Sequence, residues 1–137
     1  MKQIQSIYLF IAIAFSMSFS NAQTAVSNSI NSSIFEKLAS IENVVSIEKR
    51  KSVSHFDSNY EIWFEQAIDH NDLSKGTFRQ RVFLGFIDPL KPVFIELQGY
   101  GIYTEKAGEL ADHYKANQLT IEHRYFNNSR PEEINWN

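Results

Sequence analysis

Apolar and polar residues alternate most clearly in the middle of the chain. Tyr60, Ile62 and Phe64 are separated by single, mostly more polar residues, which is the two-residue period of a β-strand. A second strand, rich in phenylalanine and valine, is predicted over residues 77–87. Residues 67–76 between them are rich in turn-forming types. Two strands joined by one loop of this length are predicted to form an antiparallel pair.

A nearly continuous apolar run over residues 93–97 predicts a buried strand, which ends at the glycine-containing residues 99–101. Thr104 is then predicted to cap a helix, and Asn117 to close it in the left-handed conformation. The next strand is predicted over residues 119–124. The apolar face of the helix is predicted to comprise Ala107, Leu110, Ala111 and Tyr114.

This order of strand, helix and strand within about thirty residues is typical of a βαβ unit with parallel strands and a right-handed crossover. The predicted fold is therefore α/β, with antiparallel first strands followed by a βαβ unit. Parallel sheets need helices on both faces, and one crossover helix with one short N-terminal helix is too few. We therefore predict that the sequence is the N-terminal part of a larger α/β protein, truncated at Asn137.

The residues before the first long strand carry weaker patterns. Ser33 followed by Glu36 is a capping-box signature, and apolar residues at helical spacing predict a short helix over residues 34–42. A short strand is predicted over residues 44–47, and an irregular connector over residues 48–58.

The amino terminus differs in composition from the rest of the chain. Lys2 precedes an apolar segment over residues 7–15, and small residues precede Gln23. This pattern is typical of a secretory signal peptide cleaved near Ala22-Gln23, and the segment is too short for a membrane span. We therefore predict an exported protein, periplasmic or extracellular, with no stable membrane span in its mature form. The chain has no cysteine for a disulfide or a lipid anchor.

Three segments are predicted along the chain: a signal peptide over residues 1–22, a polar leader with a short N-terminal helix over residues 23–58, and the N-terminal part of the α/β domain over residues 59–137. A chain of 137 residues that is 43% hydrophobic holds one globular domain at most. Its net charge of −3 argues against nucleic acid as a partner, because nucleic-acid binding needs a clustered basic face.

The sequence lacks complete motifs for metal binding and for serine catalysis. The four histidines form no close pair with metal-ligand spacing, so no metal site and no cofactor is predicted. Serine catalysis on an α/β-hydrolase fold needs Gly-x-Ser-x-Gly, with the acid and the histidine later in the chain. Ser74 has Asp72 where the first glycine is required, and Ser129 has no histidine after it. No catalytic triad is therefore predicted within this chain.

Two stretches are predicted to lie at the carboxyl ends of neighbouring parallel strands, residues 98–101 and residues 122–126. Ligand sites of open α/β sheets collect at this edge. Glycine at positions 99 and 101 lets the backbone approach a substrate, and the corresponding loop of an α/β-hydrolase supplies a backbone N–H to the oxyanion hole. The alternative is an ordinary glycine-lined turn between strand and helix.

The triplet Glu122-His123-Arg124 has two possible readings. In a scaffolding network, Glu122 and Arg124 share one side of the strand and pair, while His123 points elsewhere. In the alternative, these residues take part directly in catalysis. Buried charges must be paired, which favours the network.

Several segments together resemble a known family. "FEQAIDHND", "GTFRQRVFL", "PVFIELQGYG" and "ELADHYKANQLTIEHRYFNNSRPEEINW" resemble the N-terminal part of secreted bacterial tripeptidyl aminopeptidases, the prolyl tri/tetrapeptidyl aminopeptidase family of serine peptidases. The resemblance runs from about residue 34 to the last residue. More distantly, Asp69-His70, Gln80-Arg81 and residues 122–125 are similar to the lysosomal Pro-X carboxypeptidase group.

The resemblance implies an α/β-hydrolase fold with an inserted helical cap, peptide substrates, and a Ser-Asp-His triad whose members all lie beyond Asn137. This chain alone is then expected to be inactive, with no catalytic residue of its own. The residues expected at the site are the oxyanion candidates Tyr100 and Gly101 and the site-edge residues Glu122, Arg124 and Tyr125. The alternatives are an exported esterase or lipase of the same fold, and a non-catalytic secreted binding module or inactive remnant.

Overall fold

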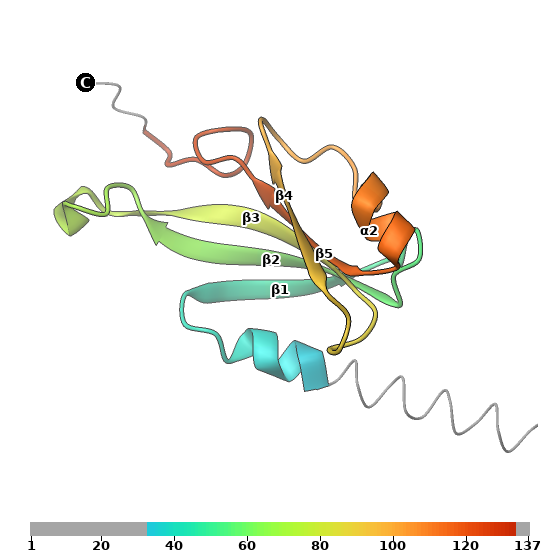
Figure 1. Ribbon diagram of the computed structural model, residues 1–137. Helices are drawn as coiled ribbons and strands as arrows, with labels where there is room; N and C mark the ends of the chain where they lie inside the picture. Colours follow the sequence, from blue (N-terminus) through green and yellow to red (C-terminus); the bar gives the residue numbers. More distant parts are fainter. Residues whose placement is uncertain (1–32, 134–137) are drawn as a thin grey trace, which may run out of the picture. The chain divides into compact units, whose positions relative to one another are not determined.

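The computed structural model describes residues 33–133 (Figure 1). The chain divides into two units, Met1–Glu36 and Lys37–Asn137. Of the first unit, only the start of a helix over residues 33–39 is described, where the sequence predicted residues 34–42. The predicted signal peptide and the predicted polar residues before this helix lie outside the described residues.

The second unit contains a five-stranded mixed sheet with the order β1-β2-β3-β5-β4 (Figure 1). The long strands β2 and β3 pair antiparallel over their full length, from Ser58 opposite Phe86 to Ala67 opposite Thr77. The predicted antiparallel pair is thus confirmed. The first three strands of the chain are β1 (Val44–Arg50), β2 (Ser58–Ala67) and β3 (Thr77–Phe86).

Strand β1 is longer than the sequence predicted. The predicted strand ended at residue 47 and gave way to an irregular connector, whereas β1 continues to Arg50 and pairs antiparallel with β2. Lys49 lies opposite Tyr60, and Arg50 opposite Asn59. Charged side chains are common on edge strands, so the end of the apolar pattern did not mark the end of the strand.

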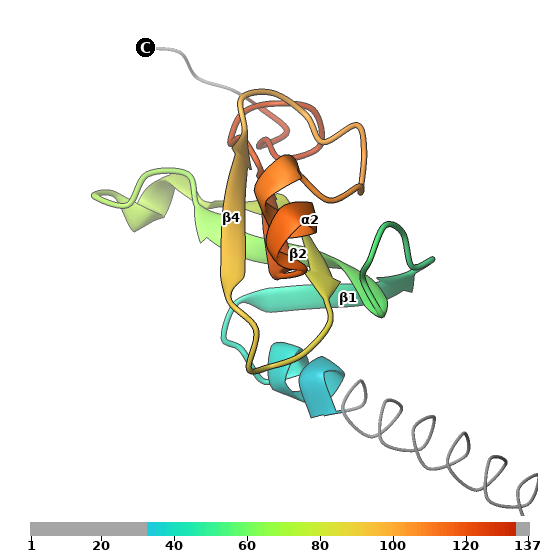
Figure 2. The same ribbon diagram turned by 45° about the vertical axis from the view of Figure 1, so that its right-hand side comes forward.

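The predicted βαβ unit is confirmed. Strands β4 (Val93–Gln98) and β5 (Asn117–Glu122) are parallel neighbours, and α2 (Glu109–Tyr114) lies in the connection between them. Figures 1 and 2 both place α2 beside these strands, where the ring of Tyr114 stacks on Phe94 with centroids 5.7 Å apart. On its other edge β5 pairs antiparallel with β3, so β5 lies inside the sheet.

The helix begins later than predicted. Its N-cap is Gly108, which makes no side-chain capping bond. The Thr104 hydroxyl instead accepts a hydrogen bond from the N–H of Lys106 (3.2 Å), which satisfies a local turn rather than a helix end. On the predicted apolar face only Ala111 is fully buried, while Leu110 and Tyr114 are exposed.

The helix also ends at another residue than predicted. The left-handed residue is Lys115 (φ 46°), and Asn117 is the first residue of β5. The Asn117 side chain is used elsewhere: its oxygen accepts from Ile87 N–H (2.7 Å), and its amide donates to the carbonyl of Asp88 (2.8 Å). These bonds tie the loop after β3 to the start of β5, a contact between segments distant in sequence.

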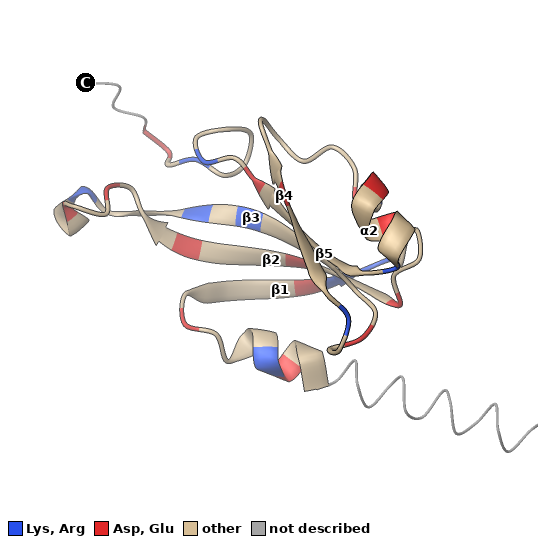
Figure 3. Cartoon of the chain, viewed as in Figure 1, with Lys and Arg blue, Asp and Glu red and all other residues tan. Residues whose placement is uncertain are grey.

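Apolar side chains of β2 and β3 form much of the core, including Tyr60, Ile62, Val82 and Leu84. Strand β4 was predicted to be buried, which is wrong in this structure, because its alternate residues Val93, Ile95 and Leu97 are exposed. Lysine, arginine, aspartate and glutamate are interspersed over the strands, without a large region of one sign (Figure 3). Within residues 33–133, no helix is long and apolar enough to cross a membrane.

Candidate functional site

The candidate site lies where β4 and β5 end side by side, with Gln98 opposite Glu122. Strand β5 stops at Glu122 instead of continuing to residue 124 as predicted. The chain then turns back, with Tyr125 (φ 70°) and Asn127 (φ 45°) in the left-handed region. A short bridge between Phe126 and Ser129 closes this turn. His123 and Arg124 therefore belong to a loop, and the strand alternation used to orient them does not apply.

The Glu122 side chain is fully buried at this edge and accepts four hydrogen bonds. One carboxylate oxygen accepts from Nη2 of Arg81 (2.9 Å), from the N–H of Ile102 (3.0 Å) and from the amide of Asn127 (3.0 Å). The other oxygen accepts from the hydroxyl of Ser129 (2.6 Å). The carboxylate thus joins β3, the loop after β4 and the turn after β5.

Burial and hydrogen bonding act in opposite directions on this carboxyl. Burial disfavours the charged form, but the hydrogen bonds from Ser129, Ile102 and Asn127, with the positive charge of Arg81, lower the pKa of Glu122 below its ordinary value. Glu122 is therefore an ionised structural acceptor at neutral pH, and it has no spare proton to donate.

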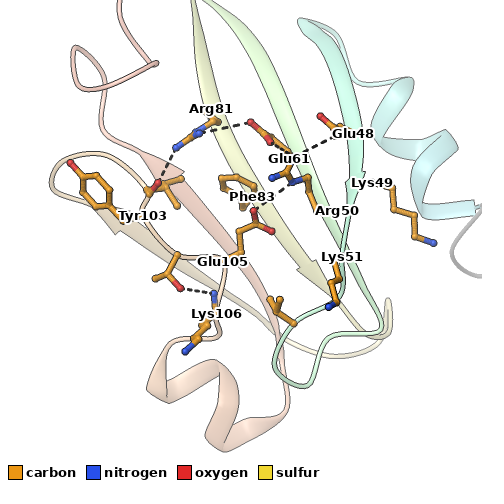
Figure 4. A pocket seen from close by; sticks show the side chains of 13 residues that line it. Glu48, Lys49, Arg50, Lys51, Glu61, Arg81, Phe83, Tyr103, Glu105 and Lys106 are labelled. Atoms are coloured by element: carbon orange, nitrogen blue, oxygen red, sulfur yellow. Dashed lines mark hydrogen bonds and ion pairs between the residues drawn. The ribbon is translucent and has the colours of Figure 1, made fainter.

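Arg81 connects the carboxylate to the loop after β4. Its Nη2 donates both to Glu122 (2.9 Å) and to the carbonyl of Ile102 (2.9 Å). On the other side it approaches Glu61 at 4.0 Å and lies over the ring of Phe83, with 5.3 Å to the centroid. Figure 4 shows Arg81 directed toward Glu61 and toward the segment that precedes Tyr103. The backbone N–H and the carbonyl of Ile102 are consequently both bound by the Arg81–Glu122 pair.

The predicted oxyanion candidates are the residues just before this point. Tyr100 is exposed, its ring lies edge-on to Phe126 (5.1 Å), and its carbonyl accepts from His123 N–H (3.3 Å). Gly101 is buried, and a Cβ there would lie 2.9 Å from Cβ of Asn127. Among the described residues, the N–H groups of Tyr100 and Gly101 donate to no acceptor.

Arg124 does not pair with Glu122, which corrects the predicted pairing. Its Nη2 donates to the carbonyls of Ala67 (3.0 Å) and Ile68 (2.9 Å), and Nη1 donates to His70 (3.0 Å). It also lies over the ring of Phe78, 5.0 Å from the centroid. The loop after β5 directs this side chain to the β2–β3 hairpin, away from the buried carboxylate.

The other two residues of the stretch behave differently. The hydroxyl of Tyr125, a predicted site-edge residue, donates to the carbonyl of Ile68 (3.1 Å) and so contacts the same hairpin as Arg124. His123 is exposed, and its Nδ1 lies 2.8 Å from the carbonyl of Arg124. Glu122 and Arg124 thus each make several polar contacts, but with different partners, and the predicted pairing between them is wrong.

Three motifs that are far apart in the sequence meet around this loop. Gln80 donates to the backbone carbonyl of Glu122 (2.8 Å), and Arg81 binds its carboxylate. His70 contacts Arg124. In the sequence, Gln80 and Arg81 are noticeable only through a family resemblance, and no motif indicates a role for Asn127 or for the Ser129 hydroxyl. No local pattern marks these partners, because the sheet alone brings them together.

A cavity of about 600 Å³ lies over β1, β2, β3 and the segment after Gly101 (Figure 4). Arg50, which lines the cavity, forms ion pairs with three other lining residues: Glu61 (3.6 Å), Glu105 (3.5 Å) and Glu48 (3.3 Å). Arg81 thus both lines this cavity, where it contacts Glu61, and binds the buried Glu122. Within residues 33–133, no three acidic or histidine side chains are grouped as a metal site would need.

Two curated relatives match part of this chain. A prolyl tri/tetrapeptidyl aminopeptidase of Streptomyces mobaraensis is 34% identical over 74 residues, which cover 53% of this chain and 16% of the relative. A probable serine protease EDA2 of Arabidopsis thaliana is 35% identical over 98 residues, which cover 58% of this chain and 19% of the relative. The chain spans less than a fifth of the length of these relatives.

A match to a whole family covers more of the chain. Residues 27–137 match the family described as PS-10 peptidase S37, and this range includes the sheet, the loop after β4 and the Glu122 network. The chain therefore belongs to the PS-10 peptidase S37 family.

Proposed function

We propose that the protein is an exported serine-type peptidase, a tripeptidyl or prolyl aminopeptidase that acts on peptide substrates. In this proposal residues 59–137 are the N-terminal part of an α/β-hydrolase domain. Membership of the peptidase family supports the reaction class. The names of the relatives, a prolyl tri/tetrapeptidyl aminopeptidase and a probable serine protease, support the serine mechanism and the substrate type.

One observation in this chain supports the mechanism most directly. The consecutive N–H groups of Tyr100 and Gly101 are without acceptors among the described residues, at the carboxyl end of a parallel strand. When a serine attacks a peptide carbonyl, negative charge develops on the carbonyl oxygen, and fixed backbone N–H groups stabilise it. We assign this role to Tyr100 and Gly101. Glu122, Arg124 and Tyr125 then shape the edge of the site.

The fold part of the proposal places the catalytic serine, aspartate and histidine beyond Asn137. The exposed apolar residues of β4, Val93, Ile95 and Leu97, favour further helices over this face, because parallel strands are normally covered on both sides. Residues 23–137 expressed alone should therefore aggregate or melt without cooperativity. A monodisperse monomer with a cooperative melting transition would contradict the proposal.

The activity is tested on the full gene product with proline-containing tripeptidyl chromogenic substrates. We expect release of the chromophore, and loss of that release after treatment with a serine-reactive inhibitor. Absence of inhibitor-sensitive release would reject the proposal. Hydrolysis of acyl esters without peptide release would identify the esterase or lipase alternative. Inactivity on both peptides and esters would identify the binding module or the inactive remnant.

The coding sequence downstream of Asn137 gives an independent test. A Gly-x-Ser-x-Gly elbow followed by an aspartate and a histidine is expected there. An early stop would favour the inactive remnant. For export, the amino terminus of the secreted protein should begin at Gln23 by mass spectrometry, and a retained Met1 on exported material would contradict cleavage.

A further inference from the structure

The peptide backbone at Ile102 is held in an unusual way. Its N–H donates to Glu122 (3.0 Å), its carbonyl accepts from Arg81 (2.9 Å), and these two side chains bind each other (2.9 Å). The three contacts form a closed ring around one residue. Arg81 makes two of them from the same nitrogen, so loss of this nitrogen opens the ring at two points.

The two preceding residues are fixed by other contacts. The carbonyl of Tyr100 accepts from His123 N–H, and Gly101 lies against Asn127, which itself donates to Glu122. Three consecutive residues are therefore held in place, while the N–H groups of Tyr100 and Gly101 remain without acceptors in the described part of the chain. Donors that are held before the reaction need no reorganisation when charge develops.

We propose that the buried Arg81–Glu122 pair is a positioning device that sets the direction of the Tyr100 and Gly101 N–H groups. The inference rests on the proposed function, since it concerns the oxyanion role of the same loop. Arg81 and Glu122 touch neither substrate nor the reacting atoms and act through the backbone of Ile102. A pair of purely structural importance would affect stability only, whereas a positioning pair also affects the transition state.

Two variants disturb the ring in complementary ways. Arg81→Lys keeps the positive charge but removes the Nη2 nitrogen that donates to both Glu122 and Ile102. Glu122→Gln keeps the shape but loses the negative charge. Both should lower kcat by about tenfold with KM little changed. This loss is smaller than the loss of about 10²–10³-fold that follows removal of an oxyanion donor. Glu61→Gln is the matched control: it removes a carboxylate from the other side of Arg81, leaves both Ile102 bonds in place, and should keep kcat.

Amide hydrogen exchange provides a readout that does not depend on turnover. In the full-length wild-type protein the Ile102 amide should exchange slowly, and the Tyr100 and Gly101 amides quickly. Both variants should accelerate exchange at Ile102, and Glu61→Gln should not. A covalent phosphonate on the wild-type enzyme should slow exchange at Tyr100 and Gly101, because its oxygen occupies the oxyanion position.

The outcomes separate this inference from the proposed function. An active, inhibitor-sensitive wild type whose folded variants keep kcat, or raise only KM, would overturn the positioning role alone. Unchanged exchange at Ile102 in both variants would do the same. If one variant does not unfold cooperatively it is set aside, and the other variant decides on the positioning role. No slowing at Tyr100 and Gly101 in the wild type with the phosphonate would overturn the oxyanion role of the loop, and the positioning inference with it. A wild type without inhibitor-sensitive activity would reject the proposed function, and the catalytic part of this inference with it.

Discussion

Glu122 and Arg124 are two residues apart, yet they serve two different regions of the molecule. Glu122 is fully buried and gathers donors from β3, from the loop after β4 and from the turn after β5. Arg124 is half-buried and donates to backbone carbonyls of the β2–β3 hairpin. We refer to these as the Glu122 anchor and the Arg124 anchor.

The difference between the two anchors lies in what remains when a partner is lost. A buried carboxylate deprived of its cation stays unpaired in a place that water does not reach, which is costly. Carbonyls of a partly exposed hairpin regain hydrogen bonds from water when the guanidinium is removed. Disruption of the Glu122 anchor should therefore affect the whole domain, and disruption of the Arg124 anchor mainly the hairpin.

The largest effect is expected for Arg81→Met, which removes the cation of the Glu122 anchor. The free energy of unfolding should fall by about 3–5 kcal/mol, because Glu122 is left as an uncompensated buried charge. Urea unfolding of the full-length protein measures this change. Arg79→Met, at an exposed position on the same strand, is the matched control and should be nearly neutral. Equal losses in both variants would show that the buried pair has no special importance.

Acid should reveal the same anchor. Because the pKa of Glu122 is lowered in the folded state, its contribution to stability is fully present above its unfolded value of about 4.3 and is lost as pH falls through the lower folded pKa. The groups facing Glu122 are Arg81, Ile102 N–H, Asn127 and Ser129. As the pH falls below about 4.3, stability should fall less steeply in Glu122→Gln than in the wild type.

The control for the acid experiment belongs to the hairpin. Hydrogen bonding to Lys75 lowers the pKa of Asp69, but this ion pair is exposed. Asp69→Asn should therefore follow the wild-type acid curve closely. Parallel curves for the wild type and Glu122→Gln would contradict the assignment of the acid sensitivity to Glu122.

A smaller effect is expected where the loop after β4 contacts Asn127, one of the partners of Glu122. Gly101→Ala would place a Cβ 2.9 Å from Cβ of Asn127, so the loop and this partner of Glu122 must separate. The expected loss is about 1–3 kcal/mol in the free energy of unfolding, the usual range for overpacking. Gly99→Ala meets no atom within 4 Å and should be neutral in the same thermal or urea titration. A neutral Gly101→Ala would mean that the loop is not held against Asn127.

The smallest effect is expected for Arg124→Lys in the Arg124 anchor. One ammonium group cannot replace the contacts to both hairpin carbonyls, and the loss should be about 1 kcal/mol. Amide exchange should accelerate over residues 67–76 and stay unchanged at Ile102. Lys75→Met, which breaks only the exposed ion pair with Asp69, should leave both regions unchanged. Faster exchange at Ile102 in Arg124→Lys would show that the two anchors form one unit.

The sequence predicted the main elements near this site because their causes are local. Alternating residues around Tyr60 to Phe64 indicated β2, and the apolar run at residues 93–97 indicated β4. The loop after β4 and the stretch from Glu122 were correctly placed at neighbouring strand ends, because a βαβ connection fixes that geometry. The errors fell on element ends, at Arg50, Gly108 and Lys115, where charged edge residues and tertiary contacts outweigh local propensity.

The partners within the site could not be read from the sequence. Strand alternation suggested that Glu122 pairs with Arg124, but the strand ends at Glu122, and Arg124 in the following loop donates to the β2–β3 hairpin instead. Arg81 reaches Glu122 only because β5 lies inside the sheet beside β3, so that Val82 faces Ile121. That order of strands follows from packing of the whole domain and is not marked in the neighbourhood of either residue.

By itself, the sequence determined the main strands in their order along the chain, the parallel unit with its glycine-containing loop, and the resemblance to a peptidase family, because periodicity, turn chemistry and motifs are carried by neighbouring residues. Only the tertiary structure decided which charges meet. Hydrogen bonds to a buried carboxylate depend on distances of about 3 Å between segments dozens of residues apart. Those distances are set by the order of strands in the sheet and by the turn after β5. As a result, Glu122 binds the loop that contains Tyr100 and Gly101, and Arg124 binds the hairpin.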